Sequence, residues 1–250
     1  MLDNPHIKDF VFGAQSVLET LRSDVEIEKL LILRGSKSEP MKEAVKIAKS
    51  LGIPITEVPK EKLERTTKKN HQGMICFISS VKYYDLDGVI NDCYSKAKDP
   101  FILILDSVTD VRNLGAIART AECAGIDAIV VPKRGAAQIT SDAMKTSSGA
   151  LNFIKICRVE RLSKAVKYLR DSGLKIIGAT EKSHSSLYEN TFDGPIGIVM
   201  GSEETGISED VMRLCNERTS IPLLGKVGSL NVSTAAGIVI YEALRQRQSK

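Results

Sequence analysis

From residue 101 onward, short apolar runs alternate with segments of helical periodicity, and this alternation constrains the fold more than any other feature of the sequence. The run at residues 101–105, Phe-Ile-Leu-Ile-Leu, has the length and continuity of a fully buried strand. Further strands are expected at residues 128–131, 153–156, 175–179, 196–200 and 220–223, with helices at 116–123, 162–170 and 211–215. Strands that alternate with helices predict a mainly parallel sheet covered by helices on both faces.

The first 80 residues contain a smaller pattern of the same kind. One helical face is traced by Met41, Ala44, Val45, Ala48 and Leu51. Strands are expected at residues 30–33, 55–58 and 74–78. Residues 81–99 are more polar and have no strong period, so we interpret them as a linker with one helix. The sequence therefore predicts an α/β protein with domains at residues 1–80 and 100–250.

The composition is that of an ordinary globular protein. Of the 250 residues, 42% are hydrophobic and 26% are charged. No apolar run approaches the roughly 20 residues needed to span a bilayer. Residues 1–6 lack a charged start followed by an apolar core, so we expect no signal peptide. These features predict a cytoplasmic protein without a membrane partner.

Charge, aromatic content and the cysteines and histidines narrow the expected ligands. The net charge of +4 fits contact with a polyanion, although many proteins that bind no nucleic acid carry as much. Aromatic residues make up 5% of the chain, which argues against binding single strands mainly by stacking on aromatic rings. The three histidines lack metal-like spacing and the five cysteines form no Cys-x-x-Cys pair. We therefore expect no metal.

Three polar loops follow predicted strands, where ligands of open parallel sheets bind. The first loop, residues 106–115, contains Asn113 and leads into a helix that carries Arg119. Its carboxylates, amide and guanidinium groups could position a polar substrate. Alternatively, Asn113 caps the helix and Arg119 is a solvated helix residue.

The second and third loops carry glycine and small polar residues. In residues 200–206, Gly201 permits close backbone approach and Glu203 places a carboxylate at the strand end, although a tight turn with exposed acids is the alternative. In residues 221–233, Ser229 and Asn231 alternate with apolar residues before the last helix, and Ser229 could be its N-cap. No histidine lies near Ser229 in the sequence, so a hydrolase triad has no support.

Taken in order, the three loops resemble the motifs of the SpoU family of RNA 2′-O-methyltransferases, which belongs to the SPOUT class. The segments at residues 12–17 and 71–74 look like the substrate-binding extension of the rRNA-methylating subgroup. The resemblance implies a C-terminal trefoil-knotted parallel sheet and a smaller N-terminal L30e-like domain. It is nearest to the bacterial 23S rRNA guanosine-2′-O-methyltransferase branch. One departure is Glu204, where many members carry glycine.

The resemblance also implies a cofactor site for S-adenosylmethionine and a set of catalytic residues. The cofactor positions are Gly201, Ile221 and Leu230, with Thr180 and Met200 as neighbours. The catalytic positions are Arg119, Asn113, Glu203, Ser229 and Asn231. Because arginine is essentially always protonated, Arg119 is either a perturbed base or an anchor for phosphate and the forming alkoxide. Both versions predict that Arg119→Ala abolishes activity.

RNA and a second copy of the chain are the implied partners. RNA-binding candidates are Lys60, Lys62, Arg65, Lys68, Lys69 and His71, which could instead form a solvated lysine-rich helix. The family forms homodimers through the knotted domain. The apolar stripe of the last helix fits such an interface and fits an intramolecular core equally well. Two alternatives remain: a tRNA ribose 2′-O-methyltransferase, and a non-catalytic RNA-binding protein that has kept the fold.

Overall fold

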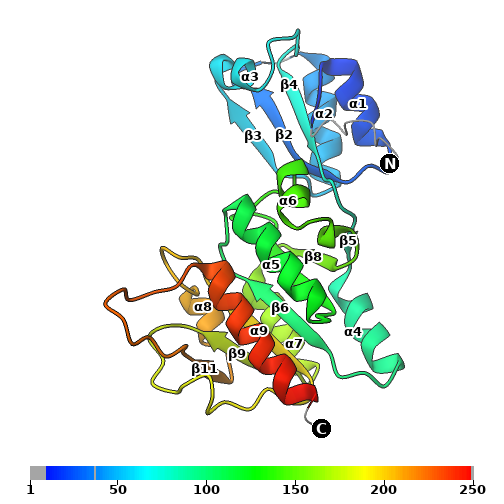
Figure 1. Cartoon of the computed structure of the whole chain (residues 1–250). Coiled ribbons are helices and arrows are strands. Elements are labelled where there is room, and N and C mark those ends of the chain that lie inside the picture. Colours follow the sequence, from blue (N-terminus) through cyan, green and yellow to red (C-terminus); the bar gives the residue numbers. More distant parts are fainter. Residues whose placement is uncertain (1–9, 37, 249–250) are drawn as a thin grey trace, which may run out of the picture. The chain divides into compact units, whose positions relative to one another are not determined.

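The computed structural model describes residues 10–36 and 38–248, and the chain divides into two compact units (Figure 1). The first unit comprises Met1–Lys82 with Gln138–Ser141, and the second comprises Tyr83–Ala137 with Asp142–Lys250. Each unit has its own sheet and its own apolar core. No helix in the described part of the chain is both long enough and apolar enough to cross a membrane.

The first unit is a four-stranded mixed sheet with helices on both faces. Its strands are β1 (Phe10–Phe12), β2 (Ile27–Leu33), β3 (Ile55–Val58) and β4 (Met74–Ile78), in the order β1-β4-β2-β3. Its helices are α1 (Ala14–Arg22), α2 (Glu39–Ser50) and α3 (Lys60–Thr66). Strand β2 runs parallel to β3 and antiparallel to β4. Alternate residues of β2 and β4 pack beneath α1 and α2, which gives this face the larger core.

The second unit is built on a seven-stranded sheet in which every described pairing is parallel. Its strands are β5 (Tyr83–Tyr84), β6 (Phe101–Leu105), β7 (Ala128–Pro132), β8 (Lys155–Val159), β9 (Lys175–Ala179), β10 (Ile196–Met200) and β11 (Glu217–Thr219). Its helices are α4 (Leu86–Ser95), α5 (Val111–Cys123), α6 (Ser141–Thr146), α7 (Leu162–Asp171), α8 (Glu209–Met212) and α9 (Val232–Gln248), with a 3-10 turn η1 (Ala150–Asn152). The strand order is β11-β9-β10-β6-β7-β8-β5.

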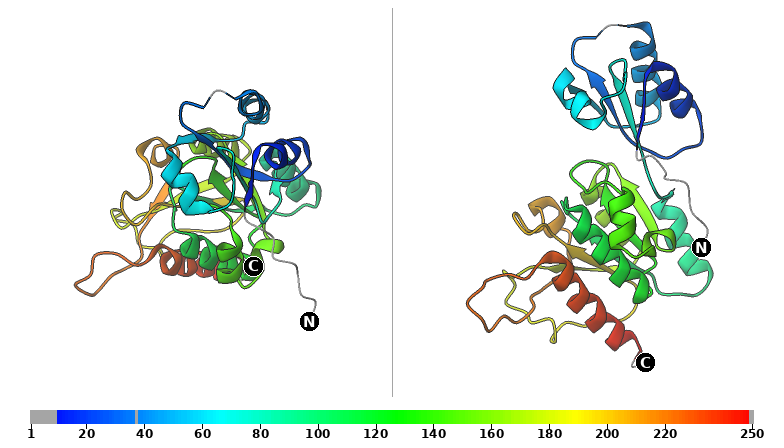
Figure 2. Two further views of the ribbon diagram at one scale, coloured as in Figure 1. Left: turned by 90° about the horizontal axis from the view of Figure 1, so that it is seen from above. Right: turned by 45° about the horizontal axis from the view of Figure 1, so that its top comes forward.

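The core of this unit explains the continuous apolar strands of the sequence. All five residues of β6 are buried, because helices cover both faces of the sheet. Ile102 and Ile104 belong to a cluster that includes buried residues of α4, α7 and α8. Helices α5 and α9 lie side by side on the other face (Figures 1 and 2). The predicted α/β architecture with a parallel sheet is confirmed.

Several element boundaries differ from the sequence expectation. Residues 83–95, within the expected linker, form β5 and α4, and α4 buries Leu86, Val89 and Ile90 in the core of the second unit. The strand expected at residues 220–223 lies earlier, as β11, because its last pairing joins Thr219 to Ala179 of β9. The strand expected at 153–156 lies slightly later, as β8.

Candidate functional site

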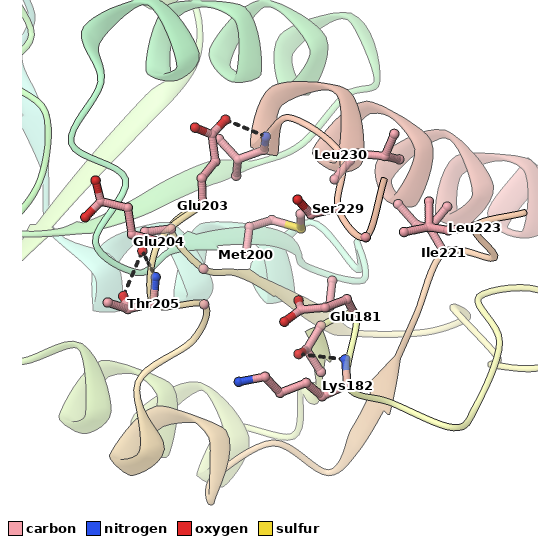
Figure 3. A pocket seen from close by; sticks show the side chains of 18 of the residues that line it. Glu181, Lys182, Met200, Glu203, Glu204, Thr205, Ile221, Leu223, Ser229 and Leu230 are labelled. Carbon is pink, nitrogen blue, oxygen red and sulfur yellow. Dashed lines mark hydrogen bonds between the residues drawn. The ribbon is translucent and has the colours of Figure 1, made fainter. Parts of the chain in front are cut away.

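A pocket of about 300 Å³ opens where loops of the second unit gather (Figure 3). It is lined by the segments that follow β9, β10 and β11 and by the residues that precede and begin α9. Strands β11, β9 and β10 are neighbours in the sheet, so their carboxyl ends lie together. The pocket therefore lies where a parallel sheet is expected to bind a ligand, and its volume is at the small end of ligand sites.

The wall after β10 is a tight turn that depends on Gly201. The Ser202 N–H donates to the Gly206 carbonyl at 3.2 Å, and the Gly206 N–H donates to the Ser202 carbonyl at 3.0 Å. A Cβ at Gly201 would lie 2.1 Å from the Gly206 carbonyl carbon and 2.3 Å from the Ile207 nitrogen. Gly201 thus permits the close approach of its own loop, which holds residues 202–206 against the pocket.

Three of the expected catalytic residues meet beside this pocket. A Glu203 carboxylate oxygen accepts from Asn231 Nδ2 at 2.6 Å, from the Val232 N–H at 3.1 Å and from Asn113 Nδ2 at 3.3 Å. Asn231 Nδ2 also donates to Asn113 Oδ1 at 3.0 Å. Glu203 therefore ties together the loop after β10 and the first turns of α5 and α9. Negative charge at the start of α9 is also favoured by the helix dipole.

The helix caps differ from the alternatives raised by the sequence. Asp110, not Asn113, caps α5, because its carboxylate accepts from the Arg112 and Asn113 N–H groups at 2.7 and 2.9 Å. Asn231, not Ser229, caps α9, and its Oδ1 accepts from the Ser233 N–H at 3.0 Å. The side chain of Asn113 and that of Ser229 are thus available for roles other than capping.

Arg119 and Ser229 lie outside the Glu203 cluster. Arg119 is exposed on α5 and forms no hydrogen bond or ion pair with any residue that the structure describes. It does not line the pocket. Ser229 is exposed and does line the pocket (Figure 3). The structure therefore brings Asn113, Glu203 and Asn231 together beside the pocket, places Ser229 in the pocket lining and leaves Arg119 apart.

The pocket walls offer apolar surface, backbone groups and a few charges. All five expected cofactor residues, Thr180, Met200, Gly201, Ile221 and Leu230, line it. Glu181 and Lys182, which sequence reasoning did not single out, line it as well (Figure 3). Their position directly after β9 was the signal that could have identified them.

Another buried group in the wall was also missed. Thr219 Oγ1 is the only buried side-chain polar atom without a hydrogen-bond partner among the described residues, and Thr219 lines the pocket. An apolar slot with backbone donors and acceptors suits adenosine, and the carboxylates and Lys182 suit the charged groups of a sulfonium amino acid. The residues present therefore fit S-adenosylmethionine.

The expected RNA-binding residues lie in the first unit and fall into two groups. Lys60, Lys62 and Arg65 are exposed on α3, and Lys68 and Lys69 are exposed just after it. Lys60 forms an ion pair with Glu64 at 3.2 Å.

His71, by contrast, is buried, and its Nδ1 accepts from the Gly73 N–H at 3.0 Å. Gln72 Oε1 in the same turn accepts from the Ala14 N–H at 2.8 Å. The two segments at residues 12–17 and 71–74 are therefore neighbours in space. The side chain of His71 supports the turn at residues 71–74, and Gln72 of this turn binds Ala14.

Comparison with known sequences assigns the chain to a family. Residues 100–241 match the model of the SpoU rRNA Methylase family. Residues 10–84 match a model described as RNA 2′-O ribose methyltransferase substrate binding. The chain belongs to the SpoU family. This confirms the resemblance drawn from the three loops and from the segments at residues 12–17 and 71–74.

Individual relatives agree with this assignment. The chain is 34% identical to a putative TrmH family tRNA/rRNA methyltransferase of Bacillus subtilis, over 96% of each chain. It is 35% identical to a 23S rRNA (guanosine-2′-O-)-methyltransferase of Photobacterium profundum, over 96% of this chain and 98% of that one. As a SpoU-family member, the chain is an S-adenosylmethionine-dependent RNA 2′-O-methyltransferase.

Solved structures of the family share the fold. The SpoU methyltransferase AviRb of Streptomyces viridochromogenes, solved with AdoMet, superposes with a TM-score of 0.61 at 22% identity, over 96% of this chain and 91% of that one. An AdoMet-bound rRNA methyltransferase of Sinorhizobium meliloti gives a TM-score of 0.59 at 21% identity, over 94% and 86%. In the described residues, no cluster of three or more histidine, cysteine or acidic side chains could hold a metal ion.

Proposed function

We propose that this enzyme methylates the ribose 2′-hydroxyl of a guanosine in 23S rRNA. The observation that carries the proposed chemistry is the convergence of Asn113, Glu203 and Asn231 beside the pocket. The guanosine and rRNA assignment is supported by the relative in Photobacterium profundum, which matches over both units. It is further supported by the N-terminal unit, since two tRNA-related structures match only 64% and 61% of this chain.

The proposed cofactor residues bind and orient rather than react. S-adenosylmethionine supplies an electrophilic methyl group when it is bound. Gly201, Ile221 and Leu230 hold the adenosine through backbone groups and apolar contact, with Thr180 and Met200 beside them. The cluster of Glu203, Asn113 and Asn231 keeps the surrounding loops in one geometry, and Ser229 orients the ribose. Fixed orientation is the main contribution that such a site makes to methyl transfer.

We propose that Arg119 anchors a phosphate of the RNA and stabilises the forming alkoxide. Its guanidinium is permanently charged and is exposed, with no partner among the described residues. Because Arg119 does not line the pocket of its own chain, we further propose a homodimer in which Arg119 completes the site of the partner subunit. The second unit exposes the apolar side chains of Leu224, Val227 and Tyr241. Exposed apolar side chains of this kind support an interface between the second units of two copies of the chain.

We also propose the trefoil knot of the SPOUT class for residues 100–250. The strand order supports it: β10 inserts between β6 and β9, β11 lies beyond β9, and the chain then returns to begin α9 beside Glu203. The long loop before α9 extends away from the sheet (Figure 2). A chain trace through residues 179–232 in an experimental density map tests this.

The proposed location of the enzyme is the cytoplasm.

In the first unit, we propose that Lys60, Lys62, Arg65, Lys68 and Lys69 contact RNA phosphates. Their exposure on and after α3 supports this. His71 then contributes by supporting the turn at residues 71–74.

The first experiment measures transfer of labelled methyl groups to purified rRNA and tRNA. The wild type is compared with Arg119→Ala and with Arg213→Ala, a control at the C-cap of α8 whose arginine pairs with Glu209 at 2.7 Å. We expect 2′-O-methylguanosine in 23S rRNA with the wild type and the control, and none with Arg119→Ala. Label in tRNA alone would replace the substrate. Cofactor binding without any transfer to RNA would favour a non-catalytic RNA-binding protein.

A further inference from the structure

The two faces of the N-terminal sheet are covered unequally. Helices α1 and α2 cover one face, whereas the short helix α3 covers only part of the other (Figure 1). Under α3, Leu63 packs on a cluster in which Leu31, Val58 and Ile75 are at most 4% exposed. At the β1 side of this same face the side chains are only half-buried. Described residues therefore leave part of this face open.

Three phenylalanine rings occupy this open part. Phe10 pairs with Phe77 across β1 and β4, and Phe12 pairs with Ile75, so all three rings point to the face that α3 partly covers. The Phe10 ring centroid lies 5.8 Å from that of Phe77 and 6.2 Å from that of Phe12. The chain has six phenylalanines and no tryptophan, so half of its phenylalanines gather here. The rings pack against the cluster under α3 and remain partly exposed, so a ligand can contact them from the surface.

Two lysines add positive charge to the rings. Lys29 pairs with Phe77 across β2 and β4, and its Nζ lies 4.7 Å from the Phe77 ring centroid. Burial lowers the pKa of Lys29, the charge of nearby Lys62 lowers it further, and Glu28 acts in the opposite direction. The ammonium groups of half-buried Lys29 and exposed Lys62 repel each other, and an anion placed between them would relieve this repulsion.

We propose that Phe10, Phe12, Phe77, Lys29 and Lys62, the phenylalanine–lysine face, bind an unpaired segment of the RNA substrate. A base stacks against the rings, and adjacent phosphates contact the two ammonium groups. Nucleotides offer both a π-face and a phosphate, which is the combination that this face matches. The inference rests on the proposed function, because it takes RNA as the substrate of this chain.

The face is also continuous with the basic residues of α3. Lys62 belongs to both surfaces, since it lies on α3 and its charge acts on Lys29. An RNA strand that contacts Lys60 and Arg65 on α3 therefore reaches the rings through Lys62. The proposal extends the expected RNA contacts from one helix to the adjoining sheet. It also includes base stacking, against which the low aromatic content of the whole chain had argued.

Because the chain lacks tryptophan, Phe77→Trp introduces a single tryptophan on this face, whose fluorescence can be excited apart from that of the six tyrosines. The full-length variant is titrated with a 12-nucleotide unstructured RNA, and Phe153→Trp serves as a control at an exposed phenylalanine of the second unit. We expect RNA to quench the fluorescence of Phe77→Trp and to leave Phe153→Trp unchanged. Equal or absent quenching in the two variants overturns the proposal.

Affinity measurements with the same RNA, labelled with fluorescein, test the rings and the charge separately. Phe77→Leu keeps an apolar side chain but removes the ring, and we expect binding to weaken roughly five- to fiftyfold. Lys29→Gln should reduce the slope of log affinity against log salt by about 0.7, while Lys46→Gln, exposed on α2, leaves the slope unchanged.

The outcomes separate this inference from the proposed function. If the wild type binds RNA and Phe77→Leu and Lys29→Gln bind equally well, the face is not used and the proposed function stands. If the wild type transfers no methyl group to RNA and binds no RNA, the proposed function fails and this inference fails with it. Thermal unfolding of each variant identifies a loss of binding that is caused by misfolding.

Discussion

In the second unit helices cover both faces of the parallel sheet, whereas in the first unit α3 leaves part of one face open. The covered sheet concentrates its polar chemistry at strand ends, where Asn113, Glu203 and Asn231 meet. The partly open sheet instead presents side chains from the strands themselves, including Phe77 and Lys29. In the function proposed above, loops fixed at several points hold the reacting group, whereas an extended surface of the sheet contacts the long RNA substrate.

The largest expected effect tests the loop cluster. Glu203→Ala removes the acceptor of Asn113, Asn231 and the Val232 N–H, so the first turns of α5 and α9 lose their common partner. We expect kcat for methyl transfer to fall about 10²- to 10³-fold. Glu204→Ala removes a carboxylate that also lines the pocket but binds none of these three groups, so it should lower kcat much less. Similar losses in both variants would mean that charge near the pocket matters, and not the cluster.

The next effect tests the covered part of the N-terminal sheet. Leu63→Ala removes a fully buried side chain beneath α3, and we expect the free energy of unfolding to fall by about 2–5 kcal/mol. Leu51→Ala, at a side chain that is 55% exposed, should change it by less than about 0.5 kcal/mol. Urea denaturation measures both values. A small effect of Leu63→Ala would show that α3 does not cover a true core.

A smaller effect is expected at the turn after β10. In Gly201→Ala the new Cβ meets backbone atoms of residues 206 and 207, so the loop must move away from the pocket. We expect the Kd for S-adenosylmethionine to rise about tenfold, measured by calorimetry. Gly225→Ala is the control, because a Cβ there meets nothing within 4 Å. An unchanged Kd for Gly201→Ala would argue against this wall as part of the cofactor site.

The smallest effect concerns the buried carboxylate of α9. Arg245 is the main cause that lowers the pKa of Glu242 from its ordinary value of 4.5 to about 2. A depressed folded pKa stabilises the fold above about pH 4.5, and this contribution is lost as the pH falls towards 2. Glu242→Gln should therefore be less stable than the wild type at pH 7, and the difference should vanish near pH 2. Glu209→Gln, in an exposed ion pair, should change stability little at either pH.

Much of the site could be predicted from the sequence because its parts are local motifs at strand ends. The meeting of Asn113 and Asn231 at Glu203 could not, since it joins segments that are 90 and 28 residues apart from Glu203. The helix caps were also ambiguous, because Asp110 and Asn113 are both good capping residues. His71 could not be assigned to a buried turn from its type, because it follows a run of exposed lysines.

For the fold, too, elements marked by a local sequence pattern could be predicted, whereas elements that depend on contacts with distant residues could not. Short continuous apolar runs located β6, β9 and β10 at the predicted residues. The segment at residues 81–99 was harder, because Asp85 and other polar residues mask a helix whose apolar side joins a distant core. Asp85 caps this helix, with its carboxylate accepting from the Gly88 N–H at 2.9 Å.

The bond between Glu203 and the start of α9 also sets an order of events during synthesis. Asn231 and Val232 leave the ribosome after every described strand of the second sheet, and Glu203 has no partner from α9 until they do. A chain that stopped before residue 231 would therefore lack two of the partners of Glu203, together with the buried side chains that α9 adds to the core. The site is therefore complete only when the last helix of the chain is in place.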